Sequence, residues 1–219
     1  MSVLTIAHRA GNSLAGLHEA STLGADVVEC DVHAYRGRLE VRHLKTAGPL
    51  PFLWDRWELA SASAPRLGLE ELLEAGRRST TFMLDLKGRR AGTGRAVADL
   101  LNRREPDRDV LVCGRYWPVV DAVAELGFVR PVLSARNRAE LAALRRRLRT
   151  GGPSTPYGVS VHESLLDTGV GPWLRDRVGV VMTWPVDDPS TLDRVLRLGA
   201  NGVITNEPEI LREVRRRDA

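Results

Sequence analysis

Apolar runs of four to eight residues alternate with segments of helical periodicity along the chain. Because these runs are short and rich in Val, Ile and Leu, they predict buried strands at residues 3–8, 26–33, 80–86, 110–114, 131–134, 157–162, 178–184 and 202–205. The helical patterns that follow them predict helices at roughly residues 12–24, 69–77, 93–104, 117–126, 137–148, 163–176, 189–199 and 208–216. Eight alternating strand and helix pairs predict an α/β fold, the (β/α)8 TIM barrel.

One extended segment, Leu39–His43, stands outside this alternation. It follows the turn Arg36-Gly37-Arg38, so we expect it to fold back on the second strand as a short β-hairpin extension. Residues 44–68 then form a long loop. The loop contains three aromatic residues, Phe52, Trp54 and Trp57. We expect them to form a small satellite cluster under the loop, and the alternative is that they cover a pocket or contact a lipid surface.

Composition limits the kind of protein. The 219 residues show no linker-like break, which predicts one domain over residues 1–219. No apolar run approaches the roughly 20 residues that cross a bilayer, and the N-terminus has no signal-peptide pattern, so we expect a cytoplasmic protein without stable membrane insertion. The net charge of +4 comes from arginine-rich helix faces rather than a nucleic-acid-binding module, so no nucleic-acid partner is expected. The oligomeric state stays open.

Two acids interrupt the apolar pattern of the second strand. Glu29 and Asp31 are two residues apart, so their side chains point to the same face. Like charges side by side in a poorly solvated place repel each other unless a cation lies between them. Asp85 near the end of the third strand offers a third carboxylate. Three hard oxygen ligands suit one divalent cation, Mg²⁺ or Ca²⁺, and the sequence does not choose between the two.

Further polar residues lie where predicted strands end. His8 and Arg9 close the first strand, Lys87 follows the third, and Trp184 ends the seventh. Chemistry on a TIM barrel gathers at these strand ends. Three acids and one divalent cation still carry a net negative charge, so Arg9 and Lys87 are expected to help hold a phosphodiester anion. The sequence therefore indicates cation-assisted cleavage of a small-molecule phosphodiester.

Cleaving a P–O bond also needs a proton acceptor for the nucleophile and a proton donor for the leaving alkoxide. His8 and His43 are the candidates for these two roles, and the sequence leaves open which is acid and which is base. Asp85 and Lys87 have an alternative as a simple ion pair, and Trp184 is either barrel packing or a wall of the substrate pocket. The remaining polar residues considered are His18 and His33, expected to be structural, and His162 and Arg115, which no motif supports.

Several segments resemble the glycerophosphodiester phosphodiesterase family, within the phospholipase-C-like phosphodiesterase superfamily of TIM barrels. The N-terminal ones are Ile6-Ala7-His8-Arg9, Gly24 to Val32 and Val41-Arg42-His43. In the C-terminal half, Trp184-Pro185-Val186-Asp187 is similar to the family's Trp-Thr-Val-Asn. Residues 198–208 are similar to its closing Gly-x-Asp-Gly-Ile-Ile-Thr-Asp-x-Pro.

The resemblance implies hydrolysis of glycerophosphodiesters to sn-glycerol 3-phosphate and an alcohol. It implies that His8 and His43 are the catalytic pair. By the same resemblance the cation ligands are Glu29, Asp31 and Asp85, and Arg9 and Lys87 hold phosphate. The alcohol group of the substrate and the formation of a cyclic phosphate intermediate stay open.

The chain departs from the family pattern in three places. Ala10-Gly11-Asn12-Ser13 stands where the family usually has Pro-Glu-Asn-Thr after its His-Arg-Gly, Leu44 stands where an Asp commonly follows the second histidine, and Asp85 stands where Glu is common. Asp85-Leu86-Lys87 is also similar to a motif of sphingomyelinase D-like phospholipases. Such a phospholipase acting on lysophospholipids, or a barrel that only binds phosphorylated ligands, are the alternative functions.

Overall fold

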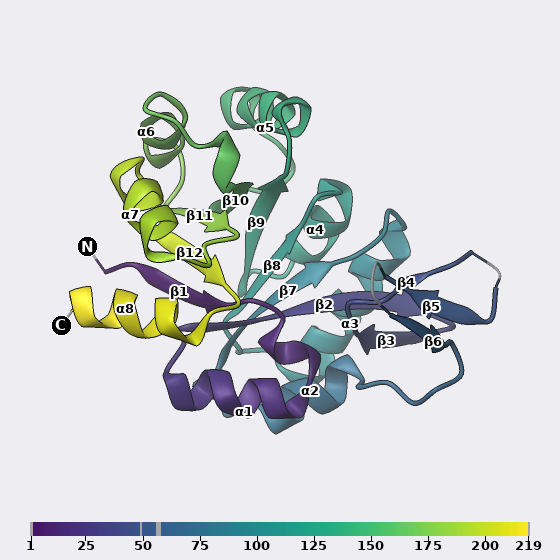
Figure 1. Cartoon of the computed structure of the whole chain (residues 1–219). Coiled ribbons are helices and arrows are strands. Elements are labelled where there is room, and N and C mark those ends of the chain that lie inside the picture. Colours follow the sequence, from purple (N-terminus) through teal and green to yellow (C-terminus); the bar gives the residue numbers. More distant parts are fainter. Residues whose placement is uncertain (1, 49, 56–57, 219) are drawn as a thin grey trace.

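A closed parallel barrel forms the centre of the computed structural model, which describes residues 2–48, 50–55 and 58–218. Within these residues, the eight barrel strands are β1 (Leu4–Ala7), β2 (Val27–Tyr35), β7 (Thr81–Leu86), β8 (Val110–Gly114), β9 (Val129–Ala135), β10 (Gly158–His162), β11 (Val180–Trp184) and β12 (Gly202–Thr205). Each strand pairs in parallel with the next, and β1 closes the ring by pairing with both β2 and β12 (Figure 1). The predicted TIM barrel is confirmed.

Helices cover the outside of the barrel (Figure 1). They are α1 (Leu14–Leu23), α2 (Leu69–Ala75), α3 (Ala91–Arg104), α4 (Trp117–Ala124), α5 (Arg138–Thr150), α6 (Val170–Arg175), α7 (Pro189–Arg197) and α8 (Pro208–Asp218), with short 3₁₀ turns η1 (Ala10–Asn12) and η2 (Glu163–Leu165). Ser13, Asn137 and Asp188 cap α1, α5 and α7, because each side chain accepts a hydrogen bond from a backbone N–H of the first turn.

The single helix predicted at residues 163–176 is wrong, since η2 and α6 are separate. The Asp167 carboxylate accepts hydrogen bonds from the backbone N–H groups of Gly169 and Val170, at 2.8 and 2.7 Å. This local turn competes with helix continuation, so α6 begins only at Val170.

Two apolar layers hold the barrel together. A large cluster fills the space between the sheet and its helices. A second cluster fills the barrel interior with Ile6, Val27, Met83, Leu111, Cys113, Val132, Val180, Met182 and Ile204. Strand side chains alternate, so the inward positions that follow these residues along β2 and β7 are the acids Glu29, Asp31 and Asp85. The barrel interior is therefore apolar along most of the strands and becomes polar at their carboxyl ends.

The predicted hairpin after the second strand is confirmed. Strand β3 (Arg38–Val41) runs antiparallel to β2, with Tyr35 opposite Arg38. Arg36 and Gly37 form the two-residue turn with positive φ angles of 47° and 80°, as a type I′ turn requires. The strand ends at Val41, two residues before the end of the predicted segment. The backbone N–H of Arg42 still bonds the Asp31 carbonyl at 3.0 Å, which keeps the chain beside β2 up to His43.

The prediction of an unstructured loop at residues 44–68 is wrong in part. Within its described residues, β4 (Lys45–Thr46), β5 (Phe52–Trp54) and β6 (Leu59–Ser61) form a small antiparallel sheet that projects from the barrel beside β3 (Figure 1). Strands of two or three residues are too short for alternation to reveal them. The satellite cluster under this sheet consists of Leu44, Leu53 and Ala62, with Tyr35 and Ala60 packed against it.

The loop aromatics contribute less to this cluster than the sequence suggests. Phe52 is partly buried, and Trp54 is 44% exposed. Trp57 lies outside the described residues. Among the described helices, none has both the length and the apolar character needed to span a membrane.

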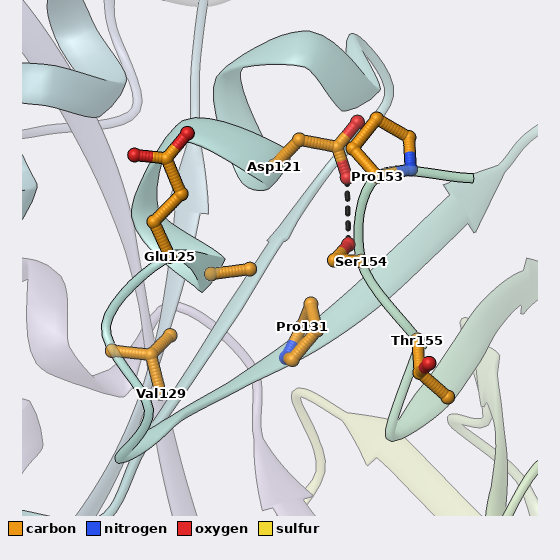
Figure 2. Close-up of a pocket in the computed structure, with 8 residues that line it drawn as sticks. Asp121, Glu125, Val129, Pro131, Pro153, Ser154 and Thr155 are labelled. Carbon is orange, nitrogen blue, oxygen red and sulfur yellow. Dashed lines mark hydrogen bonds between the residues drawn. The ribbon is translucent and has the colours of Figure 1, made fainter.

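A cavity of about 230 Å³ lies at the amino-terminal end of β9. This is the opposite end of the barrel from Glu29, Asp31 and Asp85. Figure 2 shows Asp121 of α4 beside Ser154, which lies with Pro153 and Thr155 on the segment before β10. Asp121 accepts a hydrogen bond from Ser154 Oγ at 2.7 Å and bonds both terminal nitrogens of Arg147, at 2.6 and 2.8 Å. These hydrogen bonds join α4, α5 and the segment before β10 at this end of the barrel.

Candidate active site

Three carboxylates meet at the carboxyl end of the barrel. Asp31 of β2 and Asp85 of β7 are paired in register on neighbouring strands, and Glu29 lies two residues earlier on β2. One oxygen from each of the three lies within 4.8 Å of the others. Glu29 and Asp31 are buried, whereas Asp85 is partly exposed. The structure thus brings together the three acids that the sequence singled out, and they form a possible metal-binding cluster.

The two buried acids have opposite electrostatic surroundings. Burial, and then the neighbouring Asp31 charge, raise the pKa of Glu29 to about 8. Burial also acts to raise the pKa of Asp31, but hydrogen bonds with His43, Lys87 and Asn12 outweigh it, and the pKa falls well below its usual range. Asp31 is therefore the ionised centre of the cluster, and Glu29 is the acid that lacks a compensating charge.

Two cations lie against these acids. Lys87 Nζ is 2.5 Å from Asp31 Oδ1 and also pairs with Asp85, and Arg9 Nε is 3.6 Å from Asp31 Oδ2. Burial acts to lower the pKa of Lys87, but the charges of Asp85, Asp31 and Glu29 raise it above its usual range. Once Glu29 gives up its proton, as binding of a cation requires, the three carboxylates and the two protein cations sum to a charge of −1 (−3 + 2). A divalent cation would turn this sum to +1, which favours a phosphodiester anion.

Arg9 serves the cluster through its backbone as well. Its φ angle is +56°, a left-handed conformation that costs a non-glycine residue roughly 1–2 kcal/mol. The sharp turn after His8 directs the Arg9 N–H onto Glu29 Oε2 at 2.6 Å. The strain is therefore coupled to holding the Glu29 carboxyl group in place.

Asn12 of η1 belongs to the site, although it was not among the predicted site residues. Its Nδ2 donates to Asp31 Oδ2 at 3.0 Å, and its Oδ1 accepts from the Asp31 backbone N–H at 2.8 Å. Gly11 makes this approach possible, because a Cβ there would lie 2.9 Å from the Cys30 Cβ. The signal was present in Ala10-Gly11-Asn12-Ser13, whose asparagine matches the family pattern.

His8 lies at the end of β1 and is partly buried. Its Nδ1 is 2.9 Å from Asn206 Oδ1, and its backbone N–H bonds the Thr205 carbonyl at 2.9 Å. Burial and the neighbouring Arg9 charge lower the pKa of His8. Asn206 in turn contacts Asp187, and neither of the two was predicted as a site residue, although both lie in the segments that resemble family motifs.

His43 follows β3 and contacts Asp31 directly. Its Nδ1 is 3.3 Å from Asp31 Oδ2, and its Nε2 is 3.7 Å from Asp55 Oδ2. The buried Arg42 anchors the segment, because it bonds Glu40 at 2.8 Å and also the Leu44 carbonyl. Asp55 follows β5, and no pattern in the sequence places it near His43.

Trp184 ends β11 with its side chain toward the same mouth. Its ring meets the ring of His162 edge to face, with centroids 5.0 Å apart. Arg115 pairs with Glu140, and this hydrogen bond, with a smaller contribution from the Asp85 charge, raises the pKa of Arg115. His33 is a hairpin residue whose pKa burial and Arg42 lower to about 3, and His18 is exposed on α1. The structure therefore groups His8, His43, Arg9 and Lys87 around the acids and places Trp184 at the rim.

Comparison with known proteins links the chain to one family of phosphodiesterases. The model of the glycerophosphoryl diester phosphodiesterase family matches residues 180–209, from β11 to the start of α8. No curated protein sequence matches the chain.

Solved structures match over nearly the whole chain. A glycerophosphodiester phosphodiesterase from Thermotoga maritima is 18% identical with a TM-score of 0.77, covering 98% of this chain and 99% of its own. A phosphodiesterase from Oleispira antarctica, solved with the product sn-glycerol-3-phosphate, is 18% identical with a TM-score of 0.76, covering 97% and 96%. A glycerophosphodiester phosphodiesterase from Parabacteroides distasonis is 19% identical with a TM-score of 0.69, covering 100% of both chains. The family model at residues 180–209 and the shared barrel together confirm the resemblance of this chain to the glycerophosphodiester phosphodiesterase family.

Proposed function

We propose that this chain is a divalent-cation-dependent phosphodiesterase that hydrolyses glycerophosphodiesters to sn-glycerol 3-phosphate and an alcohol. The observation that carries the proposal is the meeting of three carboxylates and two histidines at the carboxyl end of a TIM barrel. The Oleispira antarctica phosphodiesterase, which has the same fold, was solved with sn-glycerol-3-phosphate, and this supports a small-molecule glycerophosphate product.

The donor set fits a hard divalent cation. Glu29, Asp31 and Asp85 would hold Mg²⁺ or Ca²⁺ through carboxylate oxygens. The raised pKa of Glu29 supports this, because a cation would supply the charge that this buried carboxylate lacks. When bound, the cation would act as a Lewis acid on a phosphoryl oxygen.

The protein's own cations complete the charge balance. Arg9 and Lys87 both contact Asp31, so each lies at the edge of the carboxylate cluster. We assign them to the phosphate group of the substrate, because charge-assisted hydrogen bonds from guanidinium and ammonium groups are strong ligands for phosphate oxygens. Trp184 at the rim would form a wall of the pocket for the glycerol or alcohol part.

The two histidines would transfer the protons. His8 follows β1 and lies within reach of the Asp31 charge, and His43 follows β3 with its Nδ1 3.3 Å from Asp31 Oδ2, so we assign both to the bound phosphodiester. One takes the proton from the attacking oxygen, and the other gives a proton to the leaving alkoxide. The residues 1–219 would then act as one catalytic domain.

Phosphorus NMR of the purified protein with glycerophosphocholine tests the proposal, using Mg²⁺, Ca²⁺ or EDTA in parallel samples. We expect cation-dependent formation of glycerol 3-phosphate, and we expect His8→Ala and His43→Ala to remove it. Glu213→Gln is the matched control, because its carboxylate pairs with Arg216 and Arg217 in the last turn of α8.

Two results would contradict the proposal. A cyclic phosphate or lysophosphatidate product from lysophosphatidylcholine, with glycerophosphocholine untouched, would establish the sphingomyelinase D-like alternative. Unchanged turnover in His8→Ala or Asp85→Ala would show that the cluster is not the active site.

A further inference from the structure

Asp187 lies in the loop after β11 and makes three contacts with one segment of the chain. Its Oδ1 accepts from Thr205 Oγ1 at 3.1 Å and from the backbone N–H of Asn206 at 3.0 Å, and its Oδ2 accepts from Asn206 Nδ2 at 3.3 Å. The side chain of Asn206 therefore lies between Asp187 and His8, whose Nδ1 is 2.9 Å from Asn206 Oδ1.

The chemistry of these groups fixes the orientation of the amide. An ionised carboxylate only accepts hydrogen bonds, so the NH₂ group of Asn206 must face Asp187. The amide oxygen then faces His8. The flipped amide would set its oxygen against the carboxylate and would lose the bond between Nδ2 and Asp187.

The amide in turn fixes the proton on His8. Asn206 Oδ1 has no proton to give, so the bond requires the hydrogen on His8 Nδ1. A neutral imidazole carries only one N–H, and Nε2 therefore keeps its lone pair. The backbone bond from His8 N–H to the Thr205 carbonyl, at 2.9 Å, holds the imidazole and the amide in register.

We infer that Asp187 is a positioning residue that acts through Asn206 to hold His8 as the Nδ1–H tautomer. Nε2 is then the nitrogen of His8 that exchanges a proton with the substrate. The catalytic part of this inference rests on the proposed function, whereas the tautomer of His8 does not depend on it.

The two segments involved are those that resemble family motifs. This chain has Asp187 where the similar motif Trp-Thr-Val-Asn ends in Asn, and Asn206 where Thr-Asp-x-Pro has Asp. These two side chains bond each other. Relative to the motifs, this chain therefore has the carboxylate and the amide of this one contact in swapped positions. The double variant Asp187→Asn/Asn206→Asp restores the motif order and still places an acceptor beside His8.

The test is a two-bond proton–nitrogen correlation spectrum of protein with labelled histidine, recorded at a pH at which the histidines are neutral. Comparison with the spectrum of His8→Gln identifies the His8 signals. We expect the wild-type protein to show the Nδ1–H pattern for His8. Asp187→Asn should shift His8 toward a mixture of tautomers, and the double variant should recover the Nδ1–H pattern. Asp193→Asn, which removes an α7 carboxylate that pairs with Arg217, is the matched control and should change nothing.

A second variant covers the case in which Asp187→Asn does not fold. Asn206→Ala removes the acceptor itself, so it should also release the tautomer. The inference is overturned if either folded variant keeps the wild-type His8 pattern, or if the double variant does not recover it.

Turnover supplies an independent readout. In an active enzyme, Asp187→Asn should lower kcat about tenfold with little change in KM, less than the ~10²–10⁴-fold contribution of an acid or base itself. Recovery in the double variant is expected. If the wild type hydrolyses no diester but the spectra behave as described, the proposed function fails and the positioning role of Asp187 stands. If the wild type is active and the spectra do not respond, the inference fails alone.

Discussion

Lys87, directly after β7, and Asp31 of the neighbouring strand β2 form an ion pair of 2.5 Å between Nζ and Oδ1. The same ammonium pairs with Asp85, so one side chain compensates two of the three carboxylates. Any cation bound by the acids must share Asp31 and Asp85 with Lys87. The stability of the metal-free protein and its response to cations are therefore linked through this residue.

Replacing Lys87 with Met should destabilise the metal-free protein. A buried ion pair that loses one partner costs ~3–5 kcal/mol, and we expect about 2 kcal/mol because the Lys87 side chain is 31% exposed. Mg²⁺ or Ca²⁺ should then raise the melting temperature of the variant more than that of the wild type, since the cation replaces the lost charge. Urea unfolding in EDTA and thermal melting with cation measure the two effects.

Lys45→Met is the control for this variant, because the Lys45 ammonium lies over the Trp54 ring, away from the acids. It should leave the cation response unchanged. Equal responses of Lys87→Met and wild type would mean that Lys87 and the cation do not share the carboxylates.

Glu29→Gln should weaken cation binding without harming the metal-free fold. The variant removes one charged ligand, so we expect at least a tenfold loss of Mg²⁺ or Ca²⁺ affinity by titration calorimetry, about 1.4 kcal/mol. Glutamine can still accept the hydrogen bond from the Arg9 N–H, and it relieves the repulsion between Glu29 and Asp31. Glu213→Gln, which removes a carboxylate that pairs with Arg216 and Arg217 of α8, is the matched carboxylate control. Undiminished affinity in Glu29→Gln would remove this residue from the ligand set.

The barrel could be predicted well because buried parallel strands leave a direct trace. Each is a continuous apolar run, so predicted and observed strands differ by only a few residues at their ends. The acids were found for the same reason, since Glu29 and Asp31 interrupt such a run with a spacing of two. Side-chain alternation then placed them on one face with Asp85.

The other contacts of the site could not be predicted, because they join segments far apart in the chain. The bond between His8 and Asn206 spans 198 residues, and Asp55 reaches His43 from the small sheet. Neither contact produces a periodic pattern, since each depends on how loops fold over the mouth of the barrel. Motif resemblance marked Asn206 and Asp187, but only the structure shows that they bond each other.

Asp55 and Trp54 are neighbours with different expected roles. Asp55 Oδ2 is 3.7 Å from His43 Nε2, whereas the Trp54 side chain is 44% exposed. Asp55→Asn should lower turnover of glycerophosphocholine about tenfold, because His43 loses the charge beside Nε2, below the ~10²–10⁴-fold effect of losing an acid or base. Trp54→Ala should leave this turnover nearly unchanged. A large loss in Trp54→Ala would instead place this aromatic in the substrate pocket.

Asp121→Asn should destabilise the opposite end of the barrel in a pH-dependent way. Burial acts to raise the pKa of Asp121, but hydrogen bonds from Arg147 and from Ser154, of which Figure 2 shows the second, outweigh it and hold the pKa below the ordinary 3.8. The folded protein therefore binds this proton less readily than the unfolded chain does. The stabilisation is present above the unfolded pKa near 4 and is lost as the pH falls through the lower folded value.

At pH 7 we expect Asp121→Asn to cost about 2 kcal/mol of the free energy of unfolding, within the ~1.5–3 kcal/mol of hydrogen bonds to charged groups. At the acid end of the stable range the difference from wild type should shrink, because the wild-type carboxyl group is then also neutral. Urea unfolding at the two pH values measures this. Asp109→Asn, whose more exposed carboxylate pairs with Arg130, should cost less than ~1 kcal/mol at pH 7. A cost of Asp121→Asn that stays the same at low pH would show that packing around the cavity, and not the charge of Asp121, stabilises this end.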